Sequence, residues 1–169
     1  MNGEHIDGVG IVTIRPVAFD HPLPASPSPW GDWGEKDPEA MSLAMERWLV
    51  ELTSEEGETE AVGDLSAHSV WYGASPGSRA INIGISLVED HRGRGIGAVA
   101  QRLLAQELHS RGVVRVEAST DVENLAEQRA LERAGFTYEG TLRLAQGRAD
   151  GLHDLQVWSH VRPPAGPDR

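Results

Sequence analysis

The chain of 169 residues contains no cysteine. Disulfide bonds, thiolate metal sites and a cysteine nucleophile are therefore excluded. The chain also lacks a long hydrophobic run, because no stretch approaches the roughly 18 apolar residues of a membrane-spanning helix. Its first residues, Met1 to His5, carry an acidic group and no apolar run, which argues against a signal peptide. These absences predict a soluble cytoplasmic protein without a membrane partner.

Positive charge is scarce, since 15 Lys and Arg residues face 26 Asp and Glu residues and leave a net charge of −11. An acidic surface repels nucleic acid and anionic membranes, so neither is expected as a general partner. It attracts cationic substrates such as amines, although acidity is equally an ordinary route to solubility. The length fits a single domain spanning residues 1–169, whose proline-rich tail at 162–169 is expected to fray.

The most informative stretch is the turn Arg92–Gly97, which contains three glycines and two arginines. A segment with the pattern of a strand, 80–87, precedes this turn, and a segment with the pattern of a helix, 98–111, follows it. A glycine-rich turn that opens a helix leaves several backbone N–H groups free beside the partly positive helix N-terminus. The arrangement therefore predicts a phosphate-binding turn, to which Arg92 and Arg94 add charge.

Apolar spacing and turn residues divide the rest of the chain into short elements. Asp37 and Pro38 have the pattern of a helix start. The apolar residues at helical spacing behind them are Met41, Ala44, Met45 and Trp48. The segment 48–52 fits the end of this helix or a strand, and the acidic turn behind it favours the strand. The other predicted elements are strands at 11–17, 61–72 and 113–118, a helix at 124–134 closed by Gly135, and a hairpin of 137–145 with 152–161.

Two motifs in this order resemble those of the GNAT superfamily of acyl-CoA N-acyltransferases. The glycine turn of the family matches at Arg92, Gly95 and Gly97, directly after a strand. Its second signature, an asparagine that opens a helix ending in Gly-Phe, matches at Asn124 and at Gly135 with Phe136. A glycine turn alone is a weak signal, because dinucleotide-binding folds also use one.

The residues that follow narrow the resemblance. Glu139-Gly140, and a closing hairpin that contains His153-Asp154, are similar to the branch that includes the ribosomal-protein N-terminal acetyltransferases. The resemblance is strong over residues 61–158. It implies an α/β (α+β) fold with a central, mostly antiparallel, twisted sheet and helices on both faces. Two neighbouring strands, 81–87 and 113–118, are expected to splay apart in the middle of this sheet.

The resemblance also implies acetyl-CoA as co-substrate and no metal. The residues expected to contact the cofactor lie at the end of the key strand, in the glycine turn and at the second helix start. They are Ile85, Leu87, Val88, Arg92, Gly93, Arg94, Gly95, Ile96, Gly97 and Asn124. The acceptor is expected to be a primary amine, either a protein N-terminus or a small amine, and a homodimer is common in families of this kind.

Three positions that often carry catalytic groups in the family are substituted in this chain, by Asn82, Leu131 and Glu127. Glu127 is interpreted either as part of a capping box with Asn124 or as an acid or base whose pKa is raised by burial. Asp64 and His68 lie four apart and so share one face of a strand, where they form an acid/base pair or simply a polar face.

Each of the remaining candidates also has an interpretation as a structural residue without a catalytic or binding role. Glu117 is either a base beside the splay or an ordinary polar strand residue. Trp30, Trp33 and Trp71 either line the acceptor site or belong to the core. His153 and Asp154 are adjacent on a strand and face opposite ways, so shared chemistry is not expected.

Two other functions compete with acetyl transfer. The substituted catalytic positions also fit a non-catalytic acyl-CoA-binding sensor or scaffold, which turnover with any amine would exclude. A nucleotide-dependent oxidoreductase would need repeated βαβ units, whereas the pattern contains one strand–helix–strand unit around the glycine turn.

Overall fold

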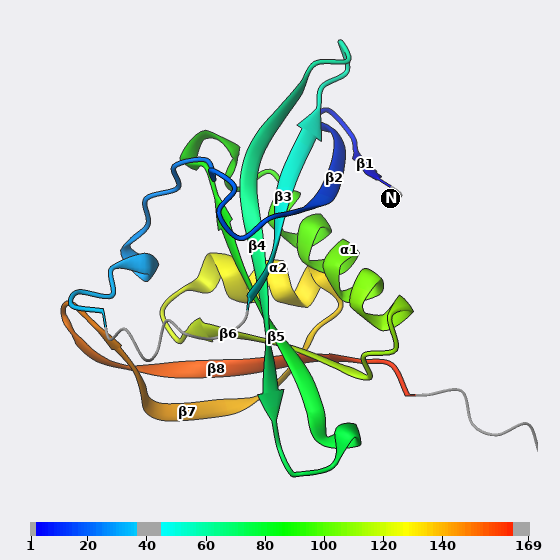
Figure 1. Ribbon diagram of the computed structural model, residues 1–169. Coiled ribbons are helices and arrows are strands. Elements are labelled where there is room, and N and C mark those ends of the chain that lie inside the picture. Colours follow the sequence, from blue (N-terminus) through cyan, green and yellow to red (C-terminus); the bar gives the residue numbers. More distant parts are fainter. Residues whose placement is uncertain (1–2, 37–44, 164–169) are drawn as a thin grey trace, which may run out of the picture.

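A computed structural model describes residues 3–36 and 45–163 (Figure 1). Eight strands form one sheet in the order β1-β2-β3-β4-β5-β6-β8-β7. The strands are β1 (Glu4–Ile6), β2 (Gly10–Val17), β3 (Met45–Thr53), β4 (Thr59–Trp71), β5 (Arg79–Leu87), β6 (Arg115–Asp121), β7 (Thr137–Arg148) and β8 (Gly151–Val161). The helices are α1 (Ile96–Ser110) and α2 (Leu125–Ala134), with short 3-10 turns η1 (Pro29–Gly31), η3 (Pro76–Ser78) and η4 (Glu89–His91).

All neighbouring strands pair antiparallel except β5 and β6. These two strands run parallel, because α1 crosses between them. Their ladder is short and ends at the pair Ile83–Ala118, although both strands continue beyond it. The predicted sheet, mostly antiparallel and splayed in the middle, is confirmed.

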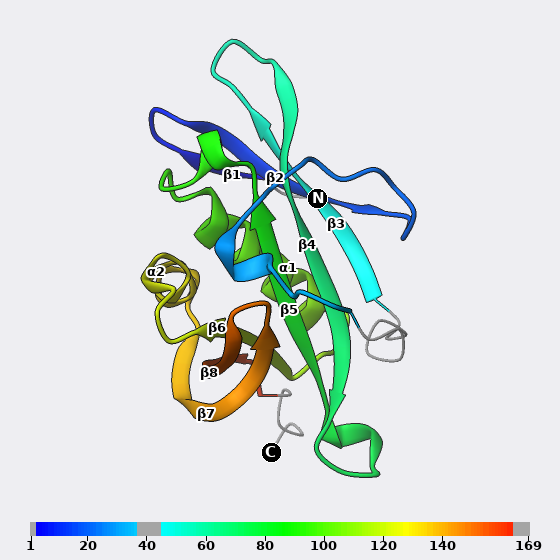
Figure 2. The same ribbon diagram turned by 90° about the vertical axis from the view of Figure 1, so that its left-hand side faces the viewer.

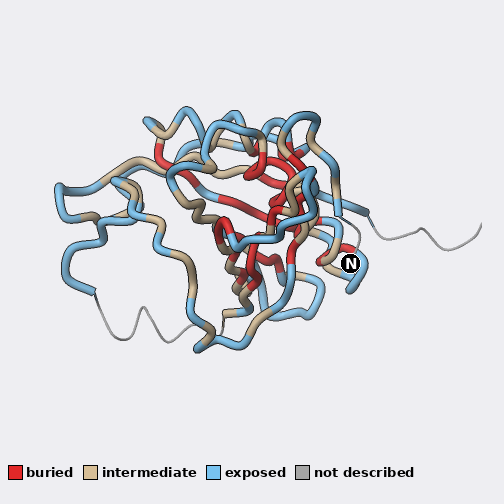
Figure 3. Tube along the Cα trace, turned by 90° about the horizontal axis from the view of Figure 1, so that it is seen from above, coloured by how far each residue is buried: buried red, intermediate tan, exposed pale blue. Residues whose placement is uncertain are grey.

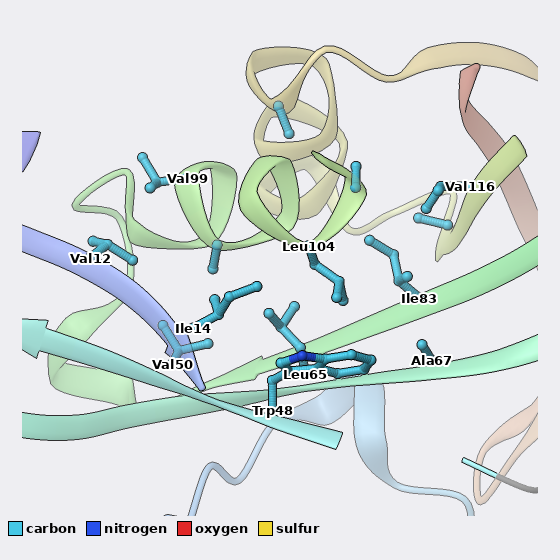
Figure 4. Packing of buried hydrophobic residues seen from close by; sticks show 14 of the residues in the cluster. Val12, Ile14, Trp48, Val50, Leu65, Ala67, Ile83, Val99, Leu104 and Val116 are labelled. Carbon is cyan, nitrogen blue, oxygen red and sulfur yellow. The ribbon is translucent and has the colours of Figure 1, made fainter. Parts of the chain in front are cut away.

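The hydrophobic core lies between the sheet and the helix α1 (Figures 3 and 4). The helix places Ile96, Val99, Leu104 and Leu108 against the sheet, as its apolar spacing predicts, and each is at most 5% exposed. α2 packs beside α1 on the same side, whereas η1 and the chain around it lie on the opposite side of the sheet (Figure 4). Among the described residues, the second face is therefore covered by an irregular segment with a short 3-10 turn rather than by an α-helix.

One element expected from the sequence falls largely outside the described residues. The helix predicted from Asp37 covers positions 37–44, which are not described. Met45 and Trp48, which were assigned to it by their spacing, lie on strand β3, and Trp48 is 2% exposed. The helical interpretation of these two residues is wrong, because pairing with β2 and β4 outweighs a short local periodicity. The strand interpretation of 48–52 is confirmed.

Neither α-helix in the described part of the chain is long and apolar enough to cross a membrane.

Candidate active site

The end of the β5–β6 ladder exposes main-chain groups of β5. In an antiparallel pair the N–H and C=O groups of alternate residues point to the same neighbour. The Val88 N–H donates to Val62 O at 2.9 Å, which places Val88 and Ser86 on the β4 side. The main-chain groups of Ile85 and Leu87 consequently face β6, beyond the last β5–β6 pair. These are two of the residues predicted to pair with an extended cofactor arm.

Val88 fits the prediction less well. Its N–H is bonded to Val62, and its carbonyl accepts a hydrogen bond from the His91 N–H at 3.0 Å. Its N–H is thus used in pairing with β4 and its carbonyl in closing the turn η4, so we do not include Val88 in the proposed contacts.

The glycine turn begins where β5 ends and leads into α1. Gly93 and Gly95 have φ values of +72° and +84°, a left-handed conformation that other residues adopt only with strain. Gly95 is the N-cap of α1 and supplies no side-chain cap, so the first N–H groups of the helix, at Ile96 and Gly97, have no acceptor within the helix. A Cβ at Gly97 would lie 3.4 Å from Leu87 Cδ1, so the helix approaches β5 closely here.

The two arginines of the turn make different contacts. Arg92 Nε donates to Leu87 O at 2.9 Å, and Arg92 Nη2 donates to Pro27 O at 2.7 Å. Arg94 Nη1 lies 3.4 Å from His91 Nδ1. Arg92 therefore ties the end of β5 to the segment that crosses the other face of the sheet, and its Nη1 donors remain for an anion.

At the start of α2, the structure separates the two interpretations of Glu127. Asn124 Oδ1 accepts a hydrogen bond from the Glu127 N–H at 3.2 Å, so Asn124 is the N-cap. The reciprocal half of a capping box is missing, because the Asn124 N–H donates to Asp121 O at 3.0 Å. The Glu127 carboxyl lies near Gln101 of α1. Burial raises the pKa of Glu127 to about 7, and the Gln101 amide lowers it by a smaller amount.

Gln101 is itself 1% exposed, and its Nε2 has no hydrogen-bond partner of normal geometry among the described residues. The Gln101 amide therefore influences the Glu127 carboxyl by proximity rather than through a well-formed hydrogen bond. The region between α1 and α2 thus holds the carboxyl of the half-buried Glu127 beside a buried amide whose Nε2 is unpaired among the described residues.

Three of the four predicted catalytic residues lie on the opposite face of the sheet from Glu127. His68 pairs with Asn82, and Asn82 pairs with Glu117, so these three side chains form one row across β4, β5 and β6. Asp64 lies on the same face, opposite Ser86. The row crosses β5 and β6 at the pair Asn82–Glu117, one position before the ladder ends at Ile83–Ala118 and the strands separate.

The titration of this face is set mainly by burial. Burial lowers the pKa of His68, which favours the neutral imidazole at pH 7. Burial also raises the pKa of Asp64, and the charge of Arg47 partly offsets that rise. His68 makes no side-chain hydrogen bond within the described part of the chain, so a ring nitrogen is left free to accept a proton.

Glu117 is less suited to be a base. It is 2% exposed, accepts a hydrogen bond from the Tyr72 hydroxyl at 2.8 Å and forms an ion pair with Arg115. Arg115 also binds Glu139, whose pKa it holds at about 2. The charge of Glu117 is thus already compensated, which supports its interpretation as a structural residue.

A second polar cluster was not expected from the sequence. Asp121, at the end of β6, is 1% exposed and lies within 2.9 Å of Arg148 Nη1 and 2.8 Å of His153 Nδ1. His153 Nε2 also contacts Asp150 at 2.8 Å, whereas Asp154 accepts the Leu144 N–H. Arg148 and His153 lie 27 and 32 positions after Asp121 in the chain, and residues so far apart form no local sequence pattern. No sequence signal could therefore have revealed this cluster.

The three candidate tryptophans differ in their exposure to solvent. Trp30 is half-buried, and its ring centroid lies 5.4 Å from the Arg148 guanidinium carbon. Trp33 and Trp71 are 43% and 57% exposed, so the interpretation of these two as core residues is wrong. No group of three or more potential metal ligands occurs within residues 3–36 and 45–163.

Comparison with known proteins agrees with this geometry. The family model of an acetyltransferase (GNAT) domain matches residues 22–137. No curated protein gives a significant match. Among solved structures, RimJ of Mycobacterium smegmatis in complex with a CoA disulfide has a TM-score of 0.67 and 21% identity, over 90% of this chain and 82% of that one.

Other similar structures are larger than this chain. The Salmonella typhimurium acetyltransferase that modifies the N-terminal serine of ribosomal protein L7/L12 has a TM-score of 0.57 and 23% identity, over 74% of this chain and 67% of that one. The microcin C7 self-immunity acetyltransferase MccE, in complex with acetyl-CoA and AMP, has a TM-score of 0.58 and 24% identity, over 70% of this chain. The chain spans 61% of MccE and 64% of a RimL structure in complex with coenzyme A. The match of the family model over most of its length shows that the chain belongs to the GNAT family of acetyltransferases.

Proposed function

We propose that the protein transfers an acetyl group from acetyl-CoA to a primary amine, by direct attack within a ternary complex. One observation carries this proposal. The main-chain groups of Ile85 and the N–H of Leu87, which face β6 beyond the last β5–β6 pair, lead directly into the uncapped N-terminus of α1, while the Leu87 carbonyl is held by Arg92. The first feature suits the amide groups of a pantetheine arm, and the second suits a pyrophosphate.

The reaction needs few groups from the protein. The amine nitrogen attacks the thioester carbonyl, the new C–N bond forms, the C–S bond breaks, the amine loses a proton and the thiolate of CoA gains one. A base is needed to keep the amine neutral, and an acid is needed beside the leaving sulfur. Holding the two reactants together supplies much of the remaining rate.

His68 is the base that this arrangement favours. Asn82 cannot accept a proton at neutral pH, but His68 is its direct neighbour across the β4–β5 pair. The lowered pKa keeps the His68 imidazole neutral near pH 7, so it can take a proton from the acceptor ammonium, directly or through one water. Asp64, on the same face, adds negative charge that attracts a cationic amine.

Glu127 is the acid that we assign to the leaving thiolate. With a pKa of about 7, its carboxyl keeps a proton in a large part of the molecules at neutral pH. It lies in the first turn of α2, three residues after the N-cap Asn124, and β6 precedes this helix in the chain. Base and acid are thus on opposite faces of the sheet, as expected if the thioester lies between the separated strands β5 and β6.

The acceptor follows from the same chemistry. An α-amino group has a pKa near 8 and a lysine side chain one near 10.4, so a histidine base suits the α-amine better. We therefore favour a protein N-terminus, with small amines of low pKa as the second choice. The similar acetyltransferase of Salmonella typhimurium modifies the N-terminal serine of ribosomal protein L7/L12.

The first experiment is a calorimetric titration of acetyl-CoA into the protein, with NADH as the control ligand. Binding of acetyl-CoA alone supports the site and justifies measuring CoA release with peptides and small amines. Because the chain has no cysteine, a thiol reagent will report only the released CoA. Binding without turnover on any amine would favour the sensor or scaffold function, and no binding would refute the assignment.

A further inference from the structure

Asp121 joins β6 to the start of α2. Its Oδ1 accepts the Glu123 N–H at 2.7 Å, and its carbonyl accepts the Asn124 N–H at 3.0 Å. The Gln128 side chain donates to the same carbonyl at 3.2 Å. One residue thereby determines how the helix that carries Asn124 and Glu127 leaves the strand.

The second oxygen of the same carboxylate holds the β7–β8 hairpin. Oδ2 contacts Arg148 and His153, from the two sides of the hairpin tip, without the angles of a directed hydrogen bond. Attraction between charges therefore provides the link. The side chains of Asp121 and Arg148 are 0% and 5% exposed, and removing one partner of such a buried pair leaves an uncompensated charge.

The hairpin in turn holds the segment 18–36 against the sheet. Arg148 stacks over Trp30, and the Ala149 N–H donates to Asp32 O at 3.1 Å. In Figure 2, η1 lies beside β5 and next to the tip of the hairpin. At its other end the segment is bound by Arg92, through Pro27. It therefore runs between the glycine turn and the hairpin tip, on the face that carries Asp64 and His68.

We propose that Asp121 is a positioning residue for the acceptor: through Arg148 and Trp30 it holds the segment 18–36 over the face on which the amine binds. This inference rests on the proposed acetyl transfer. Asp121 is not assigned contact with either substrate. Its effect is exerted through the position of the hairpin and of the segment. Asparagine in its place keeps the Oδ1 acceptor and the main-chain carbonyl that bond to the start of α2. The glycine turn meets the segment where Arg92 Nη2 donates to Pro27 O, a contact that does not involve Asp121.

The charge of His153 makes this arrangement sensitive to pH. The groups that face its ring are Asp121 from β6, Asp150 from the turn and Arg148 from β7. Asp150 and, to a smaller extent, Asp121 raise the pKa of His153 above 6.5. The link is thus complete below pH 6.5 and weakens as the pH rises through the higher pKa of the folded protein, because a neutral imidazole has no charge to attract the Asp121 carboxylate.

The test uses Asp121→Asn in the full chain, with Glu123→Gln as the matched control at an exposed position two residues away. We expect Asp121→Asn to increase the acceptor KM by about tenfold or more, with the acetyl-CoA Kd within about twofold. Hydrogen exchange in residues 18–36 and 146–153 should become faster, and the pKa of His153, measured by NMR, should fall. Glu123→Gln should change none of these values.

Equal losses of acceptor and acetyl-CoA affinity, or unchanged exchange in residues 18–36, would overturn the proposal. If Asp121→Asn does not fold, Trp30→Ala decides instead: it should increase the acceptor KM and the exchange rate, and Trp30→Phe should restore both. Exchange and the His153 pKa are measured without acceptor, so they remain decisive even if no amine is acetylated.

Discussion

At the scale of single residues, burial shifts an acid and a base in opposite directions. It raises the pKa of Glu127 to about 7 and lowers that of His68, because in both cases the charged form loses its hydration. At neutral pH the protein therefore holds a carboxylic acid that can donate a proton and an imidazole that can accept one. This acid and this base can replace the catalytic groups that the family often carries at the positions of Asn82 and Leu131.

Replacing the acid should separate its chemical from its structural role. Glu127→Gln is expected to reduce kcat and to remove the fall of kcat that we expect for the wild type above about pH 7, where the acid is ionised. Because the folded pKa is raised, ionisation of Glu127 costs stability as the pH rises from 4.5 through 7. Thermal unfolding should therefore show the variant as stable as the wild type or more stable at pH 8. A large loss of Tm with normal turnover would instead favour a structural role.

Replacing the base should affect the acidic side of the pH profile. His68→Gln is expected to lower kcat/KM about 100-fold at pH 7, a typical effect of losing a general base. The rise of kcat/KM on the acidic side, which we expect to follow deprotonation of His68 in the wild type, should disappear. Steady-state kinetics with one peptide acceptor measures both effects. In the double variant His68→Gln with Asn82→Glu, part of the rate should return, and an unchanged profile in the single variant would exclude His68.

At the scale of elements, the glycine turn and the end of the β5–β6 ladder form the two parts of the proposed acetyl-CoA site. α1 begins close to β5, since a Cβ at Gly97 would already be in van der Waals contact with Leu87, and the turn can close because Gly93 and Gly95 accept positive φ. The local pattern of strand, glycines and helix is therefore sufficient to predict an anion site. Which β5 groups are left unpaired depends on the register with β4 and β6.

A matched pair of glycine substitutions tests this element. Gly95→Glu is expected to abolish acetyl-CoA binding, because it adds a side chain and a negative charge where the pyrophosphate is placed. Gly112→Glu introduces a residue at an equally left-handed φ, +86°, past the other end of α1, where a Cβ meets nothing within 4 Å. Both should lose about 1–2 kcal/mol of stability through backbone strain. Calorimetry should show an unchanged acetyl-CoA Kd in the second variant; similar losses in both would argue against the turn as the binding site.

At the scale of the whole molecule, a pair of histidines joins α1 to the far part of the sheet. His109 Nδ1 donates to Val113 O at 2.7 Å, so its Nε2 is free to accept from His160 Nδ1, 2.9 Å away. The ring of His160 also packs edge-on against Phe136, which directly precedes β7. Such a pair holds one added proton at most, since two imidazolium rings would point N–H groups at each other.

The stability of the whole protein should consequently fall in acid. Burial and the neighbouring His109 lower the pKa of His160, so its contribution is complete above pH 6.5 and is lost as the pH falls toward the folded pKa. The free energy of unfolding, measured by denaturant titration, is expected to decrease between pH 7 and 5. In His160→Gln, which keeps a polar side chain without a titrating ring, this decrease should be smaller. An identical pH dependence in both proteins would contradict the prediction.

Much of the fold could be predicted from local patterns, and the exceptions have physical reasons. The helix at Ile96–Ser110 is marked by its apolar spacing, and the end of α2 is marked by Gly135, whose φ is +91°. Both signals act within one element. Trp48 shows the limit of this reasoning, because its helical spacing is overridden by pairing with two neighbouring strands. Helix spacing alone also does not determine that α1 and α2 lie on the same side of the sheet.

The sequence by itself predicted an anion site at the glycine turn and indicated the family, because each motif consists of residues close together in the chain. The separation of one strand pair followed from the resemblance to that family. Only the tertiary structure decided which candidates are free to react. In the folded protein Arg115 compensates the charge of Glu117, and Asp121 contacts Arg148 and His153. The His68 ring has no bonded partner among the described residues. Burial and charge pairing set these outcomes, and both depend on segments that meet only when the sheet is assembled.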